Sequence, residues 1–304
     1  MLFSGAMTAL VTPFKDNEFD EETFRAFIEW QISESIHGLV PCGTTGESAT
    51  LSHGEHERVI EVCIDQAAGR VPVLAGAGSN NTAEAIALTK FAQKAGADGA
   101  LLITPYYNKP TQQGLYDHYS AIAKAVEFPL VPYNVPSRTG CNMLPPVLCR
   151  LADEFPHICG VKEATGDMTQ ASRILEHSPP RFTLLSGDDL TAFPLLALGG
   201  KGVISVTSNI APARVVAMCN AATRGDWETA RKCHHELFPL SAAMFIESNP
   251  IPVKTALSLM GKMSSEMRLP LCQLTPEDLE KLKKVLMETG ILSEKAESAG
   301  AEEE

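Results

Sequence analysis

The chain contains 304 residues, of which 44% are hydrophobic and 20% are charged, a composition that allows a large core and is typical of a soluble enzyme. Its net charge of −12, with no basic run, argues against nucleic acid or an anionic membrane surface as a partner. No apolar run approaches the roughly 20 residues of a membrane span, and the apolar start of the chain lacks the basic residues of a signal peptide.

Short apolar runs alternate along the chain with amphipathic stretches of helical length. The expected strands are residues 7–11, 38–41, 71–75, 100–103, 130–133, 159–162, 182–185 and 203–206. The expected helices between and after them are residues 20–33, 53–68, 82–95, 115–126, 145–155, 168–177, 191–198 and 212–224. This alternation indicates a parallel sheet covered by helices, and eight such units match an α/β fold of the (β/α)8 TIM barrel type. The alternative is a doubly wound open sheet, but the glycine-rich run at residues 75–80 does not complete the dinucleotide-binding pattern.

Three further helical stretches, residues 227–245, 251–263 and 276–289, follow the last strand. Asp226 and Thr275 are suitable N-terminal caps for two of them, and Pro276 suits a first helical position. We therefore expect a catalytic barrel over residues 1–225 and a C-terminal helical appendage over residues 226–292. Residues 293–304 contain five Glu and one Lys, and we expect this acidic tail to be disordered.

Lys162 ends the apolar run at residues 158–162, and it is the first candidate for chemistry. Burying an ammonium group is costly, and the cost is avoided when the group loses its proton. The resulting neutral amine can attack a ketone and form a Schiff base. The alternative is a lysine at a frayed strand end that points to solvent. If Lys162 points into the barrel, Val161 and Glu163 must point toward the helices, because side chains alternate along a strand.

Other polar residues follow the carboxyl ends of the predicted strands, where barrel enzymes carry their active sites. Tyr133 could relay protons, and the turn at residues 43–47 offers the hydroxyls of Thr44 and Thr45 and backbone N–H groups for a carboxylate. Arg138 offers a planar fork for a second carboxylate. Taken singly, these residues could be an ordinary turn, a core tyrosine and a surface arginine, but they share one end of one barrel.

Three motifs, GTTGE at residues 43–47, YNVPSRTG at 133–140 and GVKEATGD at 160–167, carry a family resemblance. In this order and spacing they resemble the pyruvate-dependent class I aldolases of the dihydrodipicolinate synthase and N-acetylneuraminate lyase superfamily, over residues 1–292. The loop that carries Arg138 resembles that of the dihydrodipicolinate synthase branch and differs from that of the sialic acid lyases. One departure is Pro132, which removes a backbone donor from the fifth strand.

The resemblance implies a role for each candidate. Lys162 would form the Schiff base with pyruvate, and Tyr133 would relay protons. Thr44 would link Tyr133 to Tyr107 of a neighbouring subunit. Thr45 would bind the carboxylate of pyruvate, and Arg138 would bind that of L-aspartate 4-semialdehyde. Gly187 and Ile204 would line the cavity through backbone groups.

The implied reaction is the condensation of pyruvate with L-aspartate 4-semialdehyde to 4-hydroxy-tetrahydrodipicolinate, a step in diaminopimelate and lysine biosynthesis. It would need neither a metal nor an organic cofactor, since the imine itself withdraws electrons. The resemblance also implies a homo-oligomer, with a tetramer built as a dimer of dimers favoured over a dimer. A neuraminate or keto-deoxy-sugar lyase is the nearest alternative activity, and a non-catalytic keto-acid-binding barrel is a more distant one.

A metal-dependent aldolase or hydrolase is an alternative of another class. The run at residues 52–57 contains His53 and His56, but these are three residues apart and do not form the H-E-x-x-H zinc motif. The eight cysteines contain no C-x-x-C pair, which indicates free thiols and a cytoplasmic location. Cys42, beside the turn, could be a nucleophile but is better explained as a small buried residue.

A second set of polar residues follows the second to fourth predicted strands, and the resemblance implies that it binds L-lysine as a feedback inhibitor. Glu84 and the histidines could engage ammonium groups, while Asn80 and Tyr106 could bind a carboxylate. On composition alone the same residues could be a solvated helix face. The complete set is Ser48, Ala49, His53, His56, Asn80, Glu84 and Tyr106.

Overall fold

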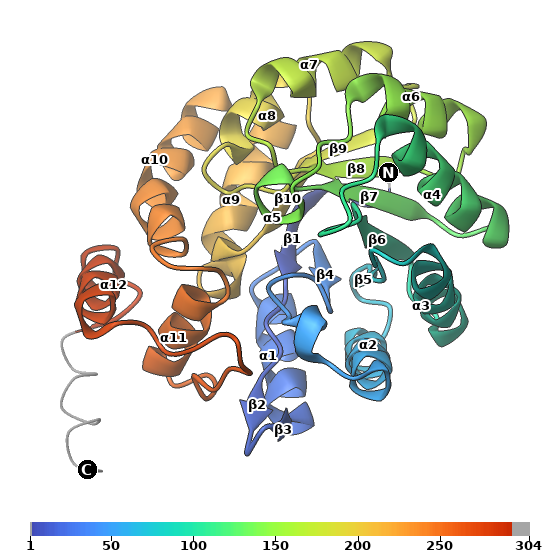
Figure 1. Cartoon of the computed structure of the whole chain (residues 1–304). Helices are drawn as coiled ribbons and strands as arrows, with labels where there is room; N and C mark the ends of the chain where they lie inside the picture. The colour runs from blue at the N-terminus through green and yellow to red at the C-terminus, as the bar shows by residue number, and fades with distance from the viewer. Residues whose placement is uncertain (1, 294–304) are drawn as a thin grey trace.

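The computed structural model describes residues 2–293, and eight parallel strands form its centre (Figure 1). Neighbours in the sheet follow the order β4-β1-β10-β9-β8-β7-β6-β5, and a bridge between Leu39 and Val73 joins β4 to β5 and closes the ring. The predicted (β/α)8 barrel is confirmed. Its strands are β1 (Gly5–Ala9), β4 (Gly38–Val40), β5 (Leu74–Gly76), β6 (Gly99–Ile103), β7 (Leu130–Asn134), β8 (Gly160–Glu163), β9 (Thr183–Ser186) and β10 (Gly202–Ser205).

A ring of helices surrounds the strands (Figure 1). Each predicted barrel helix is present, with ends that differ from the expected ones by a few residues. These helices are α1 (Glu21–Ser33), α2 (His53–Ala67), α3 (Thr82–Ala95), α4 (Gln112–Ala125), α6 (Pro145–Glu154), α7 (Met168–His177), α8 (Ala192–Leu198) and α9 (Pro212–Thr223).

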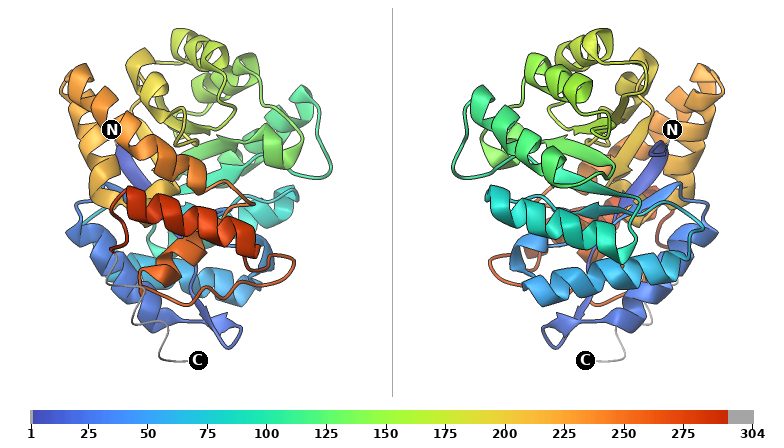
Figure 2. Two further views of the ribbon diagram at one scale, coloured as in Figure 1. Left: turned by 90° about the vertical axis from the view of Figure 1, so that its left-hand side faces the viewer. Right: turned by 90° about the vertical axis from the view of Figure 1, so that its right-hand side faces the viewer.

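The C-terminal helices are α10 (Trp227–Ala243), α11 (Ile251–Leu259) and α12 (Pro276–Glu288). Asp226 and Thr275 cap α10 and α12 as expected, since their side chains accept the N–H groups of Thr229 and Asp278. The side views show α12, in red, packed against α10 and α11 (Figure 2). Residues 294–304 of the acidic tail lie outside the described residues.

Five short elements were not expected from the sequence. The antiparallel hairpin of β2 (Phe14–Lys15) and β3 (Glu18–Phe19) turns through Asp16 and Asn17, both with positive φ. Asp and Asn tolerate this left-handed conformation better than most residues. The others are the one-turn helix α5 (Pro136–Thr139) and the 3-10 turns η1 (Ser48–Thr50) and η2 (Thr207–Asn209).

Two apolar clusters hold the barrel together. The smaller fills its interior with side chains from successive strands, among them Met7, Val40, Leu101, Leu185 and Ile204. The larger lies between the strands and the helices and continues beneath the C-terminal helices. Because both faces of the strands are buried, the strands read as almost continuous apolar runs in the sequence.

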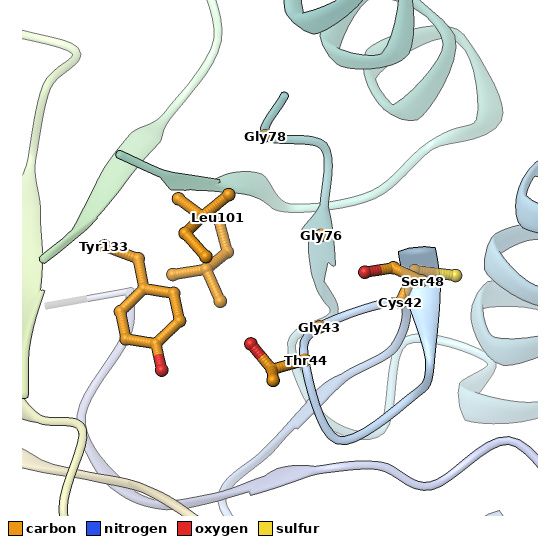
Figure 3. Close-up of a pocket in the computed structure, with 9 residues that line it drawn as sticks. Cys42, Gly43, Thr44, Ser48, Gly76, Gly78, Leu101 and Tyr133 are labelled. Atoms are coloured by element: carbon orange, nitrogen blue, oxygen red, sulfur yellow. The ribbon is translucent and has the colours of Figure 1, made fainter. Parts of the chain in front are cut away.

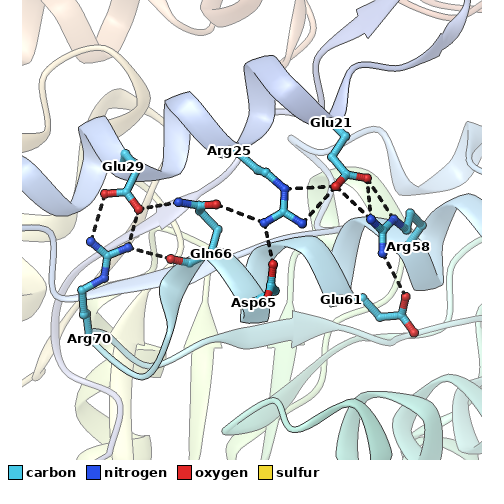
Figure 4. A network of polar contacts seen from close by, with 8 residues as sticks. All are labelled: Glu21, Arg25, Glu29, Arg58, Glu61, Asp65, Gln66 and Arg70. Carbon is cyan, nitrogen blue, oxygen red and sulfur yellow. Dashed lines mark hydrogen bonds and ion pairs between the residues drawn. The ribbon is translucent and has the colours of Figure 1, made fainter.

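On the outer surface, charged side chains link α1 to α2 (Figure 4). Arg25 bridges Glu21 and Asp65, Arg58 contacts Glu21, and Arg70 contacts Glu29. These groups are partly exposed, so each pair contributes at most about 1 kcal/mol to stability. Within residues 2–293, none of the helices combines the length and the apolar composition that a membrane span requires.

Candidate active site

Lys162 and Tyr133 lie side by side at the carboxyl ends of β8 and β7. The two residues are paired in register, and Lys162 Nζ is 4.1 Å from the centre of the Tyr133 ring. Both side chains are almost completely buried, with 6% exposure each. Val161 belongs to the outer cluster, and the Glu163 carboxylate accepts from side chains on β7 and α7. Lys162 therefore points into the barrel and its neighbours point outward, as the alternation predicted.

The surroundings of Lys162 favour a neutral amine. Burial lowers the pKa of Lys162 from 10.5 to about 7, with a further lowering by the charge of Arg138 and an opposing effect of Asp189. Asp189 is itself buried, and its Oδ2 accepts the N–H groups of Val206 (2.8 Å) and Thr207 (3.1 Å). No carboxylate of the described residues lies within 4.0 Å of Lys162 Nζ. The amine is thus available for nucleophilic attack near neutral pH.

Tyr133 is held as a protonated phenol next to this amine. Burial raises the pKa of Tyr133 to about 12, although the charge of Arg138 and the hydroxyl of Thr44 act in the opposite direction. Figure 3 shows the hydroxyl groups of Thr44 and Tyr133 beside a small cavity of about 40 Å³. A phenol that keeps its proton can donate it to an oxygen that leaves the reacting carbon.

The turn at residues 43–47 places Thr44 and Thr45 at the same end of the barrel. It is closed by hydrogen bonds from Gly46 N to Gly43 O and from Glu47 N to Thr44 O, both 3.1 Å long. Among the described residues, the N–H groups of Thr44 and Thr45 have no hydrogen-bond partner. The Thr45 hydroxyl accepts from Asn249 Nδ2 at 3.0 Å, which leaves its own proton free to donate.

A cavity of about 470 Å³ collects most of the predicted substrate and catalytic groups. Its wall includes Lys162 and Tyr133, and it is large enough for two small carboxylic acids. Arg138, at the end of α5, stands at this cavity, where its guanidinium donates to the backbone oxygen of Asn249 (3.2 Å). The predicted site residues that line the cavity are Thr44, Thr45, Tyr133, Arg138, Lys162 and Gly187.

Two predicted site residues lie away from this cavity within the chain. Ile204 is buried in the barrel interior on β10. Tyr107 is 90% exposed, so its side chain lies in solvent in the single chain, and its backbone has a φ of 71°.

A second cavity, of about 450 Å³, lies next to the first and shares Thr44, Arg138 and Asn249 with it. Asn80 is not in its wall but donates to the backbone oxygen of Tyr106 (3.1 Å). His53 contacts Glu84 at 2.8 Å, and burial lowers the pKa of His56 to about 4, so that His56 is neutral. The predicted lysine-binding residues in its wall are Ser48, Ala49, His53, His56, Glu84 and Tyr106.

The run at residues 52–57 has a structural explanation. Ser52 and Glu55 form a capping box at the start of α2, and Glu55 also pairs with Arg268. Within residues 2–293, no group of three or more His, Cys, Asp or Glu side chains is arranged to hold a metal ion.

Pro132 is accommodated by a local irregularity of the sheet. Leu130 is paired with Ile158 but Tyr133 with Lys162, so β8 carries one more residue than β7 in this interval. An extra residue of this kind is a β-bulge, and it lies where the proline offers no N–H to the ladder. Tyr133 and Lys162 are back in register immediately afterwards.

Several residues of the site were not predicted from the sequence. Asn249 and Asp188 line the first cavity, and Asp189 lies behind it. The polar run after β9 contained the two aspartates, but nothing in it indicated which would face the cavity. Asn249 belongs to the C-terminal region and had no local signal, because it meets Thr45 across 204 residues of sequence.

Fold and site together define a (β/α)8-barrel enzyme whose reactive group is a buried amine at the carboxyl end of a strand. The chain belongs to the dihydrodipicolinate synthetase family, whose model matches residues 2–289. It is 61% identical over 292 residues to 4-hydroxy-tetrahydrodipicolinate synthase of Nitratidesulfovibrio vulgaris strain Hildenborough, covering 96% of this chain and 100% of that protein.

Solved structures agree with this assignment. Chloride-inhibited dihydrodipicolinate synthase from Acinetobacter baumannii, complexed with pyruvate, superposes with a TM-score of 0.93 at 46% identity, covering 95% of this chain and 99% of that one. The enzyme from Cyanidioschyzon merolae, with lysine bound, gives a TM-score of 0.93 at 40% identity, with coverages of 96% and 99%.

Proposed function

We propose that the protein condenses pyruvate with L-aspartate 4-semialdehyde to form 4-hydroxy-tetrahydrodipicolinate, in the biosynthesis of diaminopimelate and lysine. The observation that carries this proposal is the pairing of an amine of lowered pKa, Lys162, with a protonated phenol, Tyr133, in a cavity with two separate sets of carboxylate-binding groups. The names of the curated relatives support the same reaction.

In the first half-reaction, the neutral Lys162 amine attacks the ketone carbon of pyruvate. Tyr133 donates a proton to the carbinolamine oxygen, which leaves as water and gives the imine. The Thr45 hydroxyl and the free N–H groups of the turn bind the pyruvate carboxylate. Loss of a methyl proton then converts the imine to an enamine, with Tyr133 and Thr44 passing protons.

In the second half-reaction, the enamine carbon attacks the aldehyde of the semialdehyde. Arg138, in the wall of the cavity, binds the carboxylate of this substrate. The amino group of the adduct then attacks the imine carbon, closes the ring and releases Lys162. Gly187 lines the cavity, whereas Ile204 lies in the barrel interior on β10, and no metal or organic cofactor takes part. A lyase acting on neuraminate would need room and polar groups for a long sugar chain, so assays with both aldehydes separate the two activities.

The test of this mechanism is reduction with borohydride in the presence of pyruvate, followed by intact mass and peptide mapping. We expect one reduced pyruvate adduct per chain, on Lys162, and none in Lys162→Ala, which should also lose nearly all turnover. Lys201→Ala, which removes an exposed lysine just before β10, is the matched control and should trap like the wild type. Adduct formation on another lysine, or none in active enzyme, would refute the mechanism.

We propose further that L-lysine binds in the second cavity and inhibits the enzyme. The His53–Glu84 pair offers an acidic group for an ammonium ion, and the cavity shares Thr44 with the catalytic one. The lysine-bound relative from Cyanidioschyzon merolae supports this proposal. Because the hydroxyl groups of Thr44 and Tyr133 lie beside the same small cavity, a ligand that moves the turn would alter the proton relay.

The exposed ring of Tyr107 supports a homo-oligomer in which it enters a neighbouring active site, and we propose a tetramer built as a dimer of dimers. We divide the chain into the catalytic barrel at residues 1–225 and the helical region at 226–292. All eight cysteines are unpaired in the structure, which supports a cytoplasmic location that cell fractionation can test.

A further inference from the structure

Lys254, in the first turn of α11, is a second buried lysine. Its Nζ lies 2.6 Å from Glu47 Oε1 and 2.9 Å from the backbone oxygen of Thr12, and neither Lys254 nor Glu47 exposes any side-chain surface. Lys254 also stands over the ring of Phe14, 4.4 Å from its centre. Unlike Lys162, it does not line the catalytic cavity.

Glu47 is the last residue of the turn that carries Thr44 and Thr45. It has a φ of 53°, a left-handed conformation that is strained for a residue with a side chain and must be held by its surroundings. One carboxylate oxygen accepts from Lys254, and the other accepts from the backbone N–H of Arg268 at 3.1 Å. The C-terminal helical region therefore holds the end of the turn through both oxygens of one side chain.

The same region also holds the middle of the turn, since Asn249 donates to the Thr45 hydroxyl. A hydroxyl has one proton and two lone pairs, so a donor from Asn249 leaves the Thr45 proton to point elsewhere. The turn is thus fixed at Thr45 by Asn249 and at Glu47 by Lys254 and Arg268. All three partners belong to the C-terminal region.

A contribution to stability alone does not account for the ion pair. Removing two charges from water offsets most of the attraction between them, and a well-packed apolar pair is often as stable. What an ion pair adds is a defined geometry, because both charges must meet their partners at fixed positions. We propose that the Glu47–Lys254 pair is a positioning device, which holds the Thr44–Thr45 turn in the geometry that binds the pyruvate carboxylate. This inference rests on the proposed function.

The test is the pyruvate concentration that gives half-maximal borohydride trapping on Lys162. Lys254→Met removes the cation at similar size, and Glu47→Gln removes the anion and keeps the shape. We expect both variants to need at least about tenfold more pyruvate while reaching the same maximal adduct, because misplacing a binding group by about 1 Å can cost up to about 100-fold. Leu282→Ala, in the buried face of α12, is the control for lost stability and should stay within about twofold of the wild type.

Each outcome decides the question. A half-saturating pyruvate concentration within about twofold of the wild type in either folded ion-pair variant overturns the proposal, as does an equal rise in Leu282→Ala. If circular dichroism shows that neither Lys254→Met nor Glu47→Gln folds, the pair serves the fold and the proposal is also overturned. Wild-type protein that forms no adduct with pyruvate would instead refute the proposed function, independently of the ion pair.

Discussion

Imine formation at Lys162 should depend on pH near neutrality rather than in the alkaline range of an ordinary lysine. Burial brings the pKa of Lys162 from 10.5 to about 7. At pH 7, about half of the chains would then hold a neutral amine, against roughly one in three thousand for an unperturbed lysine. Below about pH 6, the rate of imine formation should fall about tenfold for each pH unit, because only the neutral amine attacks.

The charges of Arg138 and Asp189 act on Lys162 in opposite directions. Variants that remove either charge should therefore shift the pH dependence of imine formation in opposite directions. Arg138 lowers the pKa of Lys162, so Arg138→Gln should move the midpoint to higher pH. Asp189 raises it, so Asp189→Asn should move the midpoint to lower pH. Arg224→Gln removes an exposed arginine at the end of α9 and is the charge-matched control for the first variant.

The assay is the rate of pyruvate trapping with cyanoborohydride, which survives in weakly acidic buffer, followed by intact mass from about pH 5.5 to about pH 9.5. Pyruvate is kept below saturation, so that the profile reports groups of the free enzyme. A wild-type midpoint above about pH 9 would refute the assignment of a neutral amine to the buried lysine. A shift of Arg224→Gln as large as that of Arg138→Gln would show that net charge, and not the local guanidinium, sets the profile.

Four further results are expected. Arg138→Ala should lose condensation yet still trap pyruvate, at a cost on the order of 1.5–3 kcal/mol in binding of the semialdehyde; loss of trapping in folded protein would assign Arg138 to pyruvate instead. Mixed oligomers of Tyr107→Phe and Lys162→Ala chains should regain activity, and no recovery after verified subunit exchange would place Tyr107 within its own site. Millimolar L-lysine should inhibit the wild type more than Glu84→Thr, with a coupling of about 1–3 kcal/mol; equal curves would remove Glu84 from the lysine site. Finally, the folded pKa of Lys162 lies below its unfolded value, so at this residue the unfolded chain binds more protons between about pH 7 and about pH 10.5, and the contribution of Lys162 to wild-type stability falls as pH falls through that range. Lys162→Met should therefore gain on the order of 1–4 kcal/mol in urea unfolding at about pH 7, and an unchanged or lower stability would contradict the burial cost.

The barrel could be predicted from the sequence because each strand and helix can be recognised from its own short stretch of residues. Each of its strands is an apolar run followed by a stretch with the periodicity of an amphipathic helix. Several of its helices end at a glycine, which allows the chain to turn back toward the sheet. The hairpin of β2 and β3 escaped prediction because two-residue strands are too short to show an alternation. The helix α5 has only four residues and begins at Pro136, so it resembled an irregular loop.

Only those site residues that lie at the carboxyl ends of the barrel strands could be predicted from the sequence. Strand-end residues such as Thr44, Tyr133 and Lys162 meet because parallel strands in a barrel bring their carboxyl ends together. Asn249 and Lys254 come from the C-terminal region, and no local pattern records a contact across 204 or 242 residues. For the same reason the role of Tyr107 stays a prediction, because its partner surface belongs to another copy of the chain.

The two buried lysines show why burial alone does not identify a nucleophile. Burial lowers the pKa of both, and in both a carboxylate acts against it. For Lys254 that carboxylate is Glu47, in direct contact at 2.6 Å, and the lysine side chain exposes no surface. For Lys162 that carboxylate is Asp189. Its Oδ2 already accepts the backbone N–H groups of Val206 and Thr207, which come directly after β10. The difference between a structural and a reactive lysine therefore lies in what the neighbouring carboxylate binds, a property of residues distant in sequence.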